Sequence, residues 1–232
     1  MAKKLMILVF VLSIISAMFF VENRKLTHTI EETQKINEIQ RINQEMQEMR
    51  IKLASKSLAS DLALNYETWL VSNVIAEELY VDSDGKFKKE WGLFLGELAQ
   101  QHNIDPYIVY ELLKTETGGT FDPDLVGPKT QYGHAYGIAQ FMKNTAPWIA
   151  EMAELPYSDE LLHDPLYSIE LSVHYLNFLY TRYEDWDHAL TAYHRGMGGL
   201  EAYITRNGHA MSEYAVEIQE RATEFDKVAY VE

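Results

Sequence analysis

From Phe87 onward, apolar residues recur at helical spacing, and no run of alternating β-branched residues interrupts them. Apolar positions three and four residues apart lie on one face of an α-helix, whereas a half-buried strand alternates with a period of two. Two such faces comprise Phe87, Trp91, Phe94, Leu95 and Leu98 in the first helix and Ile169, Val173, Leu176 and Tyr180 in a later one. The pattern predicts an all-α domain.

Several helices also carry a recognisable start. Asp105-Pro106 and Asp164-Pro165 each place an N-cap carboxylate before a proline at the first helical position. We expect the second of these helices to reach about Tyr183. Ser212 is placed to cap a last helix that ends near Phe225.

The first 25 residues are of a different kind. Lys3 and Lys4 precede an apolar run from Leu5 to Val21, which lies at the lower limit for spanning a bilayer and lacks a small-x-small cleavage site. We expect residues 1–25 to form an uncleaved signal anchor, with a cleaved signal peptide as the alternative. The rest of the chain would then lie on the extracytoplasmic side of the cell membrane.

Residues 26–85 are predicted to form a helical stalk. They contain apolar residues at 3-4-3-4 spacing, namely Ile39, Ile42, Met46, Met49 and Leu53. Two heptads do not define a coiled coil, so self-association through the stalk and an unpartnered helix both stay open. Apolar content rises from Leu62 and a turn follows at residues 82–85, so the globular domain should begin between residues 60 and 88. We assign it to residues 86–232.

Composition excludes several classes of function. The net charge is −15, and residues 1–60 hold nine basic and six acidic residues, so the acidic excess belongs to the later part of the chain. Such a chain is not expected to bind nucleic acid. The absence of cysteine excludes disulfides and thiolate metal sites, and the eight histidines show no ligand spacing. We therefore expect no metal and no cofactor.

Glu116 is the strongest candidate for chemistry. It follows Leu112 and Leu113 by four and three residues on the apolar face of the helix that Pro106 opens, and Gly118-Gly119 should end that helix. Apolar neighbours and a helix C-terminus both disfavour a carboxylate, so the pKa of Glu116 should be raised, as a general acid requires. An ordinary surface glutamate at a frayed helix end is the alternative.

Four motifs extend this observation. Residues 116–123 (ETGGTFDP) resemble the E-S-x-F-x-P signature of lytic transglycosylases, and residues 137–142 (GIAQFM) resemble their G-L-M-Q-x-M motif. Residues 192–196 (AYHRG) resemble A-Y-N-x-G, and residues 212–216 (SEYAV) resemble the last, tyrosine-bearing motif. In this order they cover about residues 88–225. They resemble the lysozyme-like domain of soluble lytic transglycosylases and goose-type lysozymes.

The resemblance implies a role for each matching residue. Glu116 would be the single catalytic acid and base that cleaves the bond between N-acetylmuramic acid and N-acetylglucosamine in peptidoglycan glycan strands, leaving a 1,6-anhydro end. Thr117 would help to hold the glutamate. Gly137 and Gln140 would form the floor of the saccharide groove, and Tyr193 and Tyr214 would line it, with core packing as the alternative for both tyrosines.

The motifs also depart from the family pattern. The loop after Glu116 is at least one residue longer than usual, and Ile138-Ala139 replaces a leucine-methionine pair. His194 replaces an asparagine and would add pH sensitivity near pH 6.5 if it contacts sugar; a helix-surface histidine is the alternative.

Two other functions stay open. Asp122 or Asp124 would serve as the second carboxylate of a muramidase, that is, a hydrolase of the same fold. A non-catalytic peptidoglycan-binding or assembly module is the third hypothesis.

Overall fold

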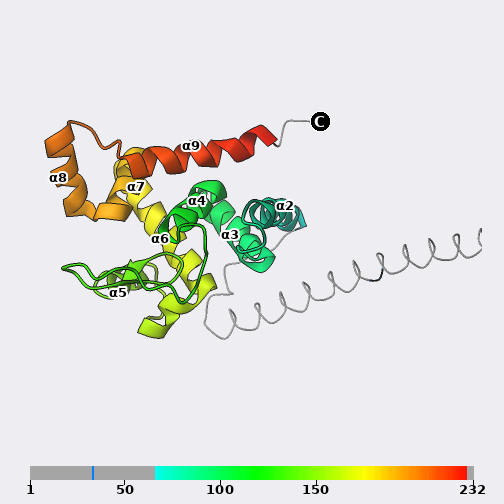
Figure 1. The fold of residues 1–232 in the computed structure, drawn as a ribbon. Helices are drawn as coiled ribbons and strands as arrows, with labels where there is room; N and C mark the ends of the chain where they lie inside the picture. The colour runs from blue at the N-terminus through cyan, green and yellow to red at the C-terminus, as the bar shows by residue number, and fades with distance from the viewer. Residues whose placement is uncertain (1–32, 34–65, 229–232) are drawn as a thin grey trace, which may run out of the picture. The chain divides into compact units, whose positions relative to one another are not determined.

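The computed structural model describes residue 33 and residues 66–228 of the 232-residue chain (Figure 1). The expected anchor at residues 1–25 and the heptad positions from Ile39 to Leu53 lie outside the described residues. Among the helices that are described, none combines the length and the apolar character needed to cross a membrane.

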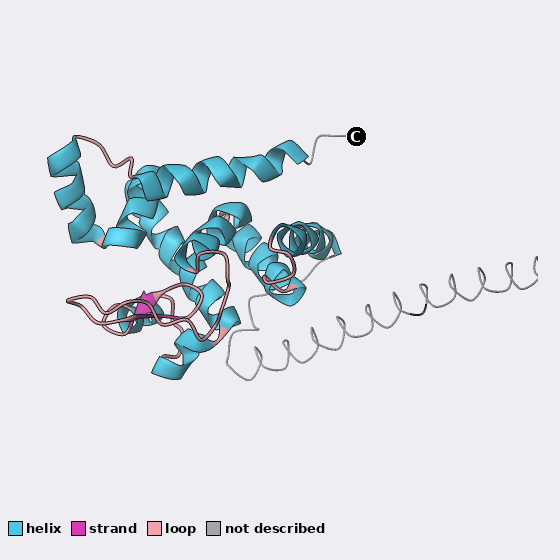
Figure 2. Ribbon diagram, viewed as in Figure 1, coloured by secondary structure: helices cyan, strands magenta, loops and turns pink. Residues whose placement is uncertain are grey.

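The regular secondary structure of the described residues is helical apart from one small hairpin, and loops join these elements (Figure 2). Its elements are α2 (Tyr66–Asp82), α3 (Lys89–His102), α4 (Pro106–Glu116), β1 (Ala135–Tyr136), β2 (Phe141–Met142), α5 (Ala146–Met152), the 3-10 helix η2 (Asp159–His163), α6 (Pro165–Tyr183), α7 (Trp186–Arg195), α8 (Met197–Asn207) and α9 (Glu213–Val228). The prediction of a mainly helical domain is confirmed. The antiparallel β1–β2 pair was not predicted, since two residues per strand are too few to show alternation.

The predicted helix starts are confirmed by their hydrogen bonds. The Asp105 carboxylate accepts a hydrogen bond from the Tyr107 backbone N–H at 2.8 Å, and Asp164 caps α6 in the same manner. At the start of α9, the Ser212 hydroxyl oxygen accepts from the Ala215 N–H at 3.2 Å. Each cap satisfies a backbone donor that the first turn of a helix leaves free.

Helix α2 belongs to the packed domain, although its residues fall in the range expected for the stalk. Its side chains Ile75 and Leu79 are buried, and the helix packs along α3. The Gln100 amide of α3 also donates to the Ser72 hydroxyl at 3.0 Å. The packed fold therefore includes α2, which lies before residue 86.

Helix α6 forms the centre of the fold and packs against α3, α4, α5 and α7. Elsewhere in the core, Phe87, Tyr110 and Phe121 form a buried aromatic cluster with ring centroids 5.1 to 5.4 Å apart. Edge and offset contacts between such rings add to the free energy gained from burial. Because Phe121 lies in the loop after α4, this cluster fixes the chain just beyond Glu116.

Candidate active site

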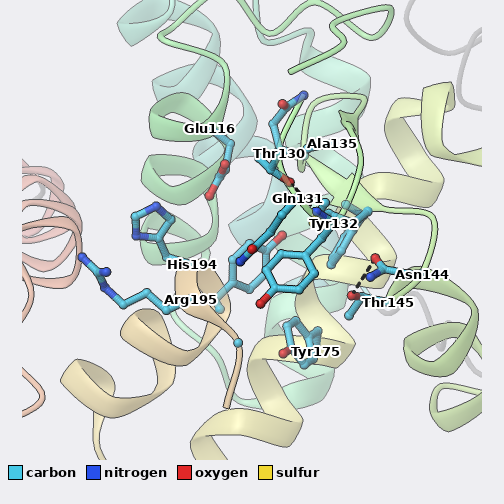
Figure 3. Close-up of a pocket in the computed structure, with 15 residues that line it drawn as sticks. Glu116, Thr130, Gln131, Tyr132, Ala135, Asn144, Thr145, Tyr175, His194 and Arg195 are labelled. Carbon is cyan, nitrogen blue, oxygen red and sulfur yellow. Dashed lines mark hydrogen bonds between the residues drawn. The ribbon is translucent and has the colours of Figure 1, made fainter. Parts of the chain in front are cut away.

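Glu116 is the last residue of α4, and its side chain lines a cavity of about 640 Å³ (Figure 3). Leu112 and Leu113 on the preceding turn are fully buried, so the apolar face of α4 directs Glu116 inward. The other lining residues come from the loop before β1, the hairpin, the two residues before α5, α6 and the end of α7: Thr130, Gln131, Tyr132, Ala135, Gln140, Phe141, Met142, Asn144, Thr145, Tyr175, Tyr193, His194, Arg195 and Gly196.

One short hydrogen bond holds the Glu116 carboxyl group. Tyr214, in the first turn of α9, donates its hydroxyl proton to Glu116 Oε1 at 2.6 Å, which joins residues 98 positions apart. Burial raises the pKa of Glu116 to about 7, against the smaller lowering effect of the Tyr214 hydrogen bond. Burial and the Glu116 charge raise the pKa of Tyr214 well above 10, so this phenol remains a donor. A substantial fraction of Glu116 is thus protonated near neutral pH.

His194 packs against this pair. Its ring stacks on Tyr214 with centroids 4.4 Å apart and planes 14° from parallel. Burial, and secondly the charge of Arg195, lower the pKa of His194 below 6.5. The pH sensitivity that the sequence suggested near pH 6.5 is therefore displaced to lower pH, and His194 is mainly neutral at pH 7.

Tyr193 supports the floor of the cavity. Its hydroxyl donates to the Ala139 carbonyl at 3.1 Å and lies 3.3 Å from the Ser172 hydroxyl, so it joins α7 to the β1–β2 hairpin and α6. The rings of Tyr193, Tyr175 and Phe141 lie 5.4 to 6.3 Å apart in a continuous aromatic group. Flat apolar rings of this kind are suited to the C–H face of a sugar.

Gln140 and Gly137 form the turn of the hairpin. The Gln140 amide donates to the Gly137 carbonyl at 2.8 Å, and its side chain lines the cavity. Gly137 is buried and lies outside the lining. Its φ is +71°, and a Cβ there would come within 1.8 Å of the Leu162 carbonyl oxygen. Glycine is thus required for the backbone to pack against η2, and Gly137 acts by positioning Gln140.

Thr117 lies next to Glu116 but contacts the backbone instead. Its buried hydroxyl donates to the Leu113 carbonyl at 2.8 Å, and this contact caps the C-terminal end of α4. Thr117 therefore positions the helix end that carries Glu116, and no hydrogen bond joins its hydroxyl to the carboxyl group in the described residues.

The lengthened loop after Glu116 is accommodated by left-handed backbone. Gly118 and Gly119 have φ values of +58° and +74°, and the buried Phe121 has φ +50°. Two consecutive glycines adopt these angles without a steric penalty, which lets the chain turn early and return Phe121 to the core. The aromatic anchor of the motif is therefore kept despite the extra length.

Among the described residues that line this cavity, Glu116 is the only one with a carboxyl group in its side chain. Asp122 and Asp124 are exposed and lie outside the lining; the Asp122 carboxylate accepts from the Asp124 N–H at 3.0 Å, and Asp124 approaches His163 at 3.8 Å. Within the described ranges, no group of three or more histidine or acidic side chains is arranged to hold a metal ion.

Several lining residues were not predicted from the sequence. Tyr175 lies on α6 and completes the aromatic group, and Arg195 borders the cavity beside His194. The sequence offers only a weak indication of either residue. Tyr175 is one of fifteen tyrosines, and Arg195 occupies the variable position of its motif. The loop residues Gln131 and Tyr132 have no periodic signal at all.

Comparison with models of protein families identifies the family of this chain. The model of the transglycosylase SLT domain matches residues 94–215, more than half of the chain. The chain belongs to this family. The matched range of the SLT domain runs from α3 into α9 and includes both Glu116 and Tyr214.

A search of solved structures finds lytic transglycosylases that are similar to this chain at low sequence identity. An inactive mutant of the lytic transglycosylase Slt from Pseudomonas aeruginosa is similar with a TM-score of 0.50 and 16% identity, over 67% of this chain and 30% of that chain. The 70-kDa soluble lytic transglycosylase from Escherichia coli has a TM-score of 0.41 and 16% identity, over 77% of this chain and 32% of that chain. A complex of the 70-kDa soluble lytic transglycosylase with bulgecin A has a TM-score of 0.48 and 13% identity, over 82% of this chain and 35% of that chain.

The chain thus matches about a third of the length of these solved proteins. The similarity to Slt supports the lysozyme-like fold that the motifs implied. No curated protein matches the chain.

Proposed function

We propose that this SLT domain is a membrane-anchored peptidoglycan lytic transglycosylase that uses Glu116 as its single acid and base. The observation that carries the proposal is a lone carboxyl group in the cavity, with a pKa raised to about 7 and held by Tyr214. A general acid works best when its pKa lies near the operating pH. Family membership supports the same substrate class, the β-1,4-linked glycan strands of peptidoglycan.

In the first half-step, protonated Glu116 gives its proton to the glycosidic oxygen between N-acetylmuramic acid and N-acetylglucosamine. The bond from that oxygen to C1 of the muramic residue then breaks, and positive charge develops at C1. Glu116 becomes a carboxylate at this moment, and the Tyr214 hydroxyl stabilises the new negative charge by its hydrogen bond.

In the second half-step, the Glu116 carboxylate takes the proton of the muramic C6 hydroxyl as that oxygen bonds to C1. The product carries a 1,6-anhydro ring, and Glu116 is protonated again. Because the nucleophile belongs to the substrate, neither a positioned water nor a second carboxylate is required. This agrees with a cavity whose described lining contains Glu116 as its only acidic residue.

The aromatic floor would hold the sugar rings during both steps. Tyr175, Tyr193 and Phe141 offer apolar surface, and Gln140 and Asn144 offer polar groups at the edge of the same cavity. Burial raises the pKa of Tyr193 well above 10, so its hydroxyl stays protonated and bound to the Ala139 carbonyl. We assign Tyr193 to shaping the floor and Tyr214 to contact with the catalytic group.

Digestion of purified cell wall tests the proposal against its two alternatives. We expect fragments that end in 1,6-anhydro-N-acetylmuramic acid, identified by mass. Reducing ends would instead indicate a muramidase, with Asp122 or Asp124 brought to the substrate by movement of their exposed loop. An intact wall, with fragments bound but uncut, would indicate the non-catalytic module.

The membrane anchor is part of the proposal and rests on the apolar run from Leu5 to Val21. We expect the full-length protein to sediment with membranes and to stay there after a high-salt wash, because burial of a long apolar helix does not depend on ionic strength. Recovery of a soluble form whose first residue lies near position 18 to 23 would show a cleaved signal peptide. Crosslinking of the membrane fraction would test self-association through the stalk.

A further inference from the structure

A second concavity of about 390 Å³ lies beside the Glu116 cavity, between the end of α7 and the helix α8. We call it the α8 groove, and it is lined by His194, Arg195, Gly199, Ala202, Tyr203 and Arg206. His194 and Arg195 also line the Glu116 cavity, so the two hollows are neighbours that share these side chains. Figure 3 shows these two side chains on the side of the cavity next to Glu116.

Arg195 is held in place within the groove. Its guanidinium group lies 4.9 Å from the centre of the Tyr203 ring, and the Tyr203 hydroxyl donates to the Met211 carbonyl at 3.1 Å. Gly199 permits this close packing, since a Cβ there would lie 2.8 Å from the Arg195 Cβ. A cation on an aromatic face keeps its charge and its outward-facing N–H groups.

The charge of the groove is not compensated. Neither Arg195 nor Arg206 forms an ion pair with a described carboxylate, whereas Lys89, Lys114 and Arg221 each do. Among the residues that the structure describes, none that lines the α8 groove is acidic. The chain as a whole has a net charge of −15, whereas this hollow carries two arginines without ion pairs. Its local positive charge favours an anionic ligand.

Helix α8 contributes little to the core. Leu200 is its only buried residue, and the helix packs mainly on α7. Because burial is the main stabilising term for a helix in a protein, α8 is better explained as a wall of the groove than as a support of the fold.

On the basis of the proposed function, we propose that the α8 groove binds the carboxylates of the peptide that muramic acid carries on its lactyl group. A muramic residue placed at Glu116 would direct this acidic peptide past His194 to Arg195 and Arg206. Arginine pairs with carboxylates through two parallel hydrogen bonds, which gives both affinity and orientation. The acidic remainder of the domain would repel the same peptide.

The test compares glycan strands that keep their peptides with the same strands after an amidase has removed them. The quantity measured is the ratio of kcat/KM for the two substrates, with the full-length protein in detergent. Arg206→Gln is the main variant, because Arg206 lines the groove and not the Glu116 cavity. We expect this ratio to fall about fivefold, near the upper end for a solvent-exposed ion pair.

Arg182→Gln is the matched control, since Arg182 is an exposed arginine on α6 that lines neither hollow. It should leave the ratio unchanged, whereas added salt should lower the ratio of the wild type. An unchanged ratio in Arg206→Gln, or an equal fall in Arg182→Gln, would overturn the assignment of the groove.

The result can be separated from failure of the proposed function. If the wild type cuts neither substrate, calorimetric binding of the two strands replaces the kinetic ratio. Preference for peptide-bearing strands that Arg206→Gln reduces would still support the groove. Equal binding of both strands by the wild type would reject it.

Discussion

Glu116→Gln is expected to reduce kcat for wall cleavage at least about ten-thousand-fold while the protein folds and binds wall fragments as before. Glutamine keeps the size of the side chain and accepts the Tyr214 hydrogen bond, but it transfers no proton. Because the same group serves both half-steps, the loss should reach the upper end of what acid–base catalysis contributes. Product release from purified wall, followed by chromatography, measures the effect.

Asp122→Asn is the matched control for this experiment. The Asp122 side chain is exposed, lies outside the cavity lining and bonds the backbone of its own loop. We expect its activity to remain within about twofold of wild type, as for surface changes away from a site. Near-normal cleavage by Glu116→Gln would contradict the mechanism, and equal losses in both variants would favour a two-carboxylate hydrolase.

Tyr214→Phe should lower the maximal rate about tenfold and move the alkaline limit of activity to higher pH. Activity requires Glu116 to be protonated at the start, so it falls as pH rises through a pKa of about 7. The Tyr214 hydrogen bond lowers that pKa, and its removal therefore raises it. The rate falls because the carboxylate formed in the first half-step loses its charge-assisted hydrogen bond.

Tyr157→Phe provides the comparison. Its hydroxyl also donates to a carboxylate, Asp159 at 2.9 Å, but both residues lie outside the cavity. Its pH profile should coincide with that of the wild type. An alkaline limit in Tyr214→Phe that is unchanged, or that moves to lower pH, would show that the contact with Glu116 does not tune the catalytic group.

The parts of this fold that the sequence predicted are those with local causes. The caps at Asp105 and Asp164 depend on a carboxylate and a proline within two residues, and the buried face of α4 depends on a period of 3.6. The same period directed Glu116 inward, and burial raises the pKa of its carboxyl group to about 7.

The parts that were missed depend on contacts across the chain. The hydrogen bond of Tyr214 to Glu116 spans 98 residues, and no pattern in either helix specifies it. Thr117 is adjacent to Glu116 in sequence, yet its hydroxyl satisfies a helix carbonyl. The α8 groove lies between the end of α7 and the helix α8, and that its arginines lack ion pairs is visible only once the described side chains are placed in space.

The central claim is that one carboxyl group cleaves the glycan without using water, and digestion of wall in heavy-oxygen water tests it most directly. An oxygen from the substrate closes the anhydro ring, so mass spectrometry should find no solvent oxygen in the new muramic ends of a wild-type digest. Activity should also depend on Glu116 in the same reaction. One solvent oxygen incorporated at each new muramic end would contradict the account, because it would show that water attacks C1.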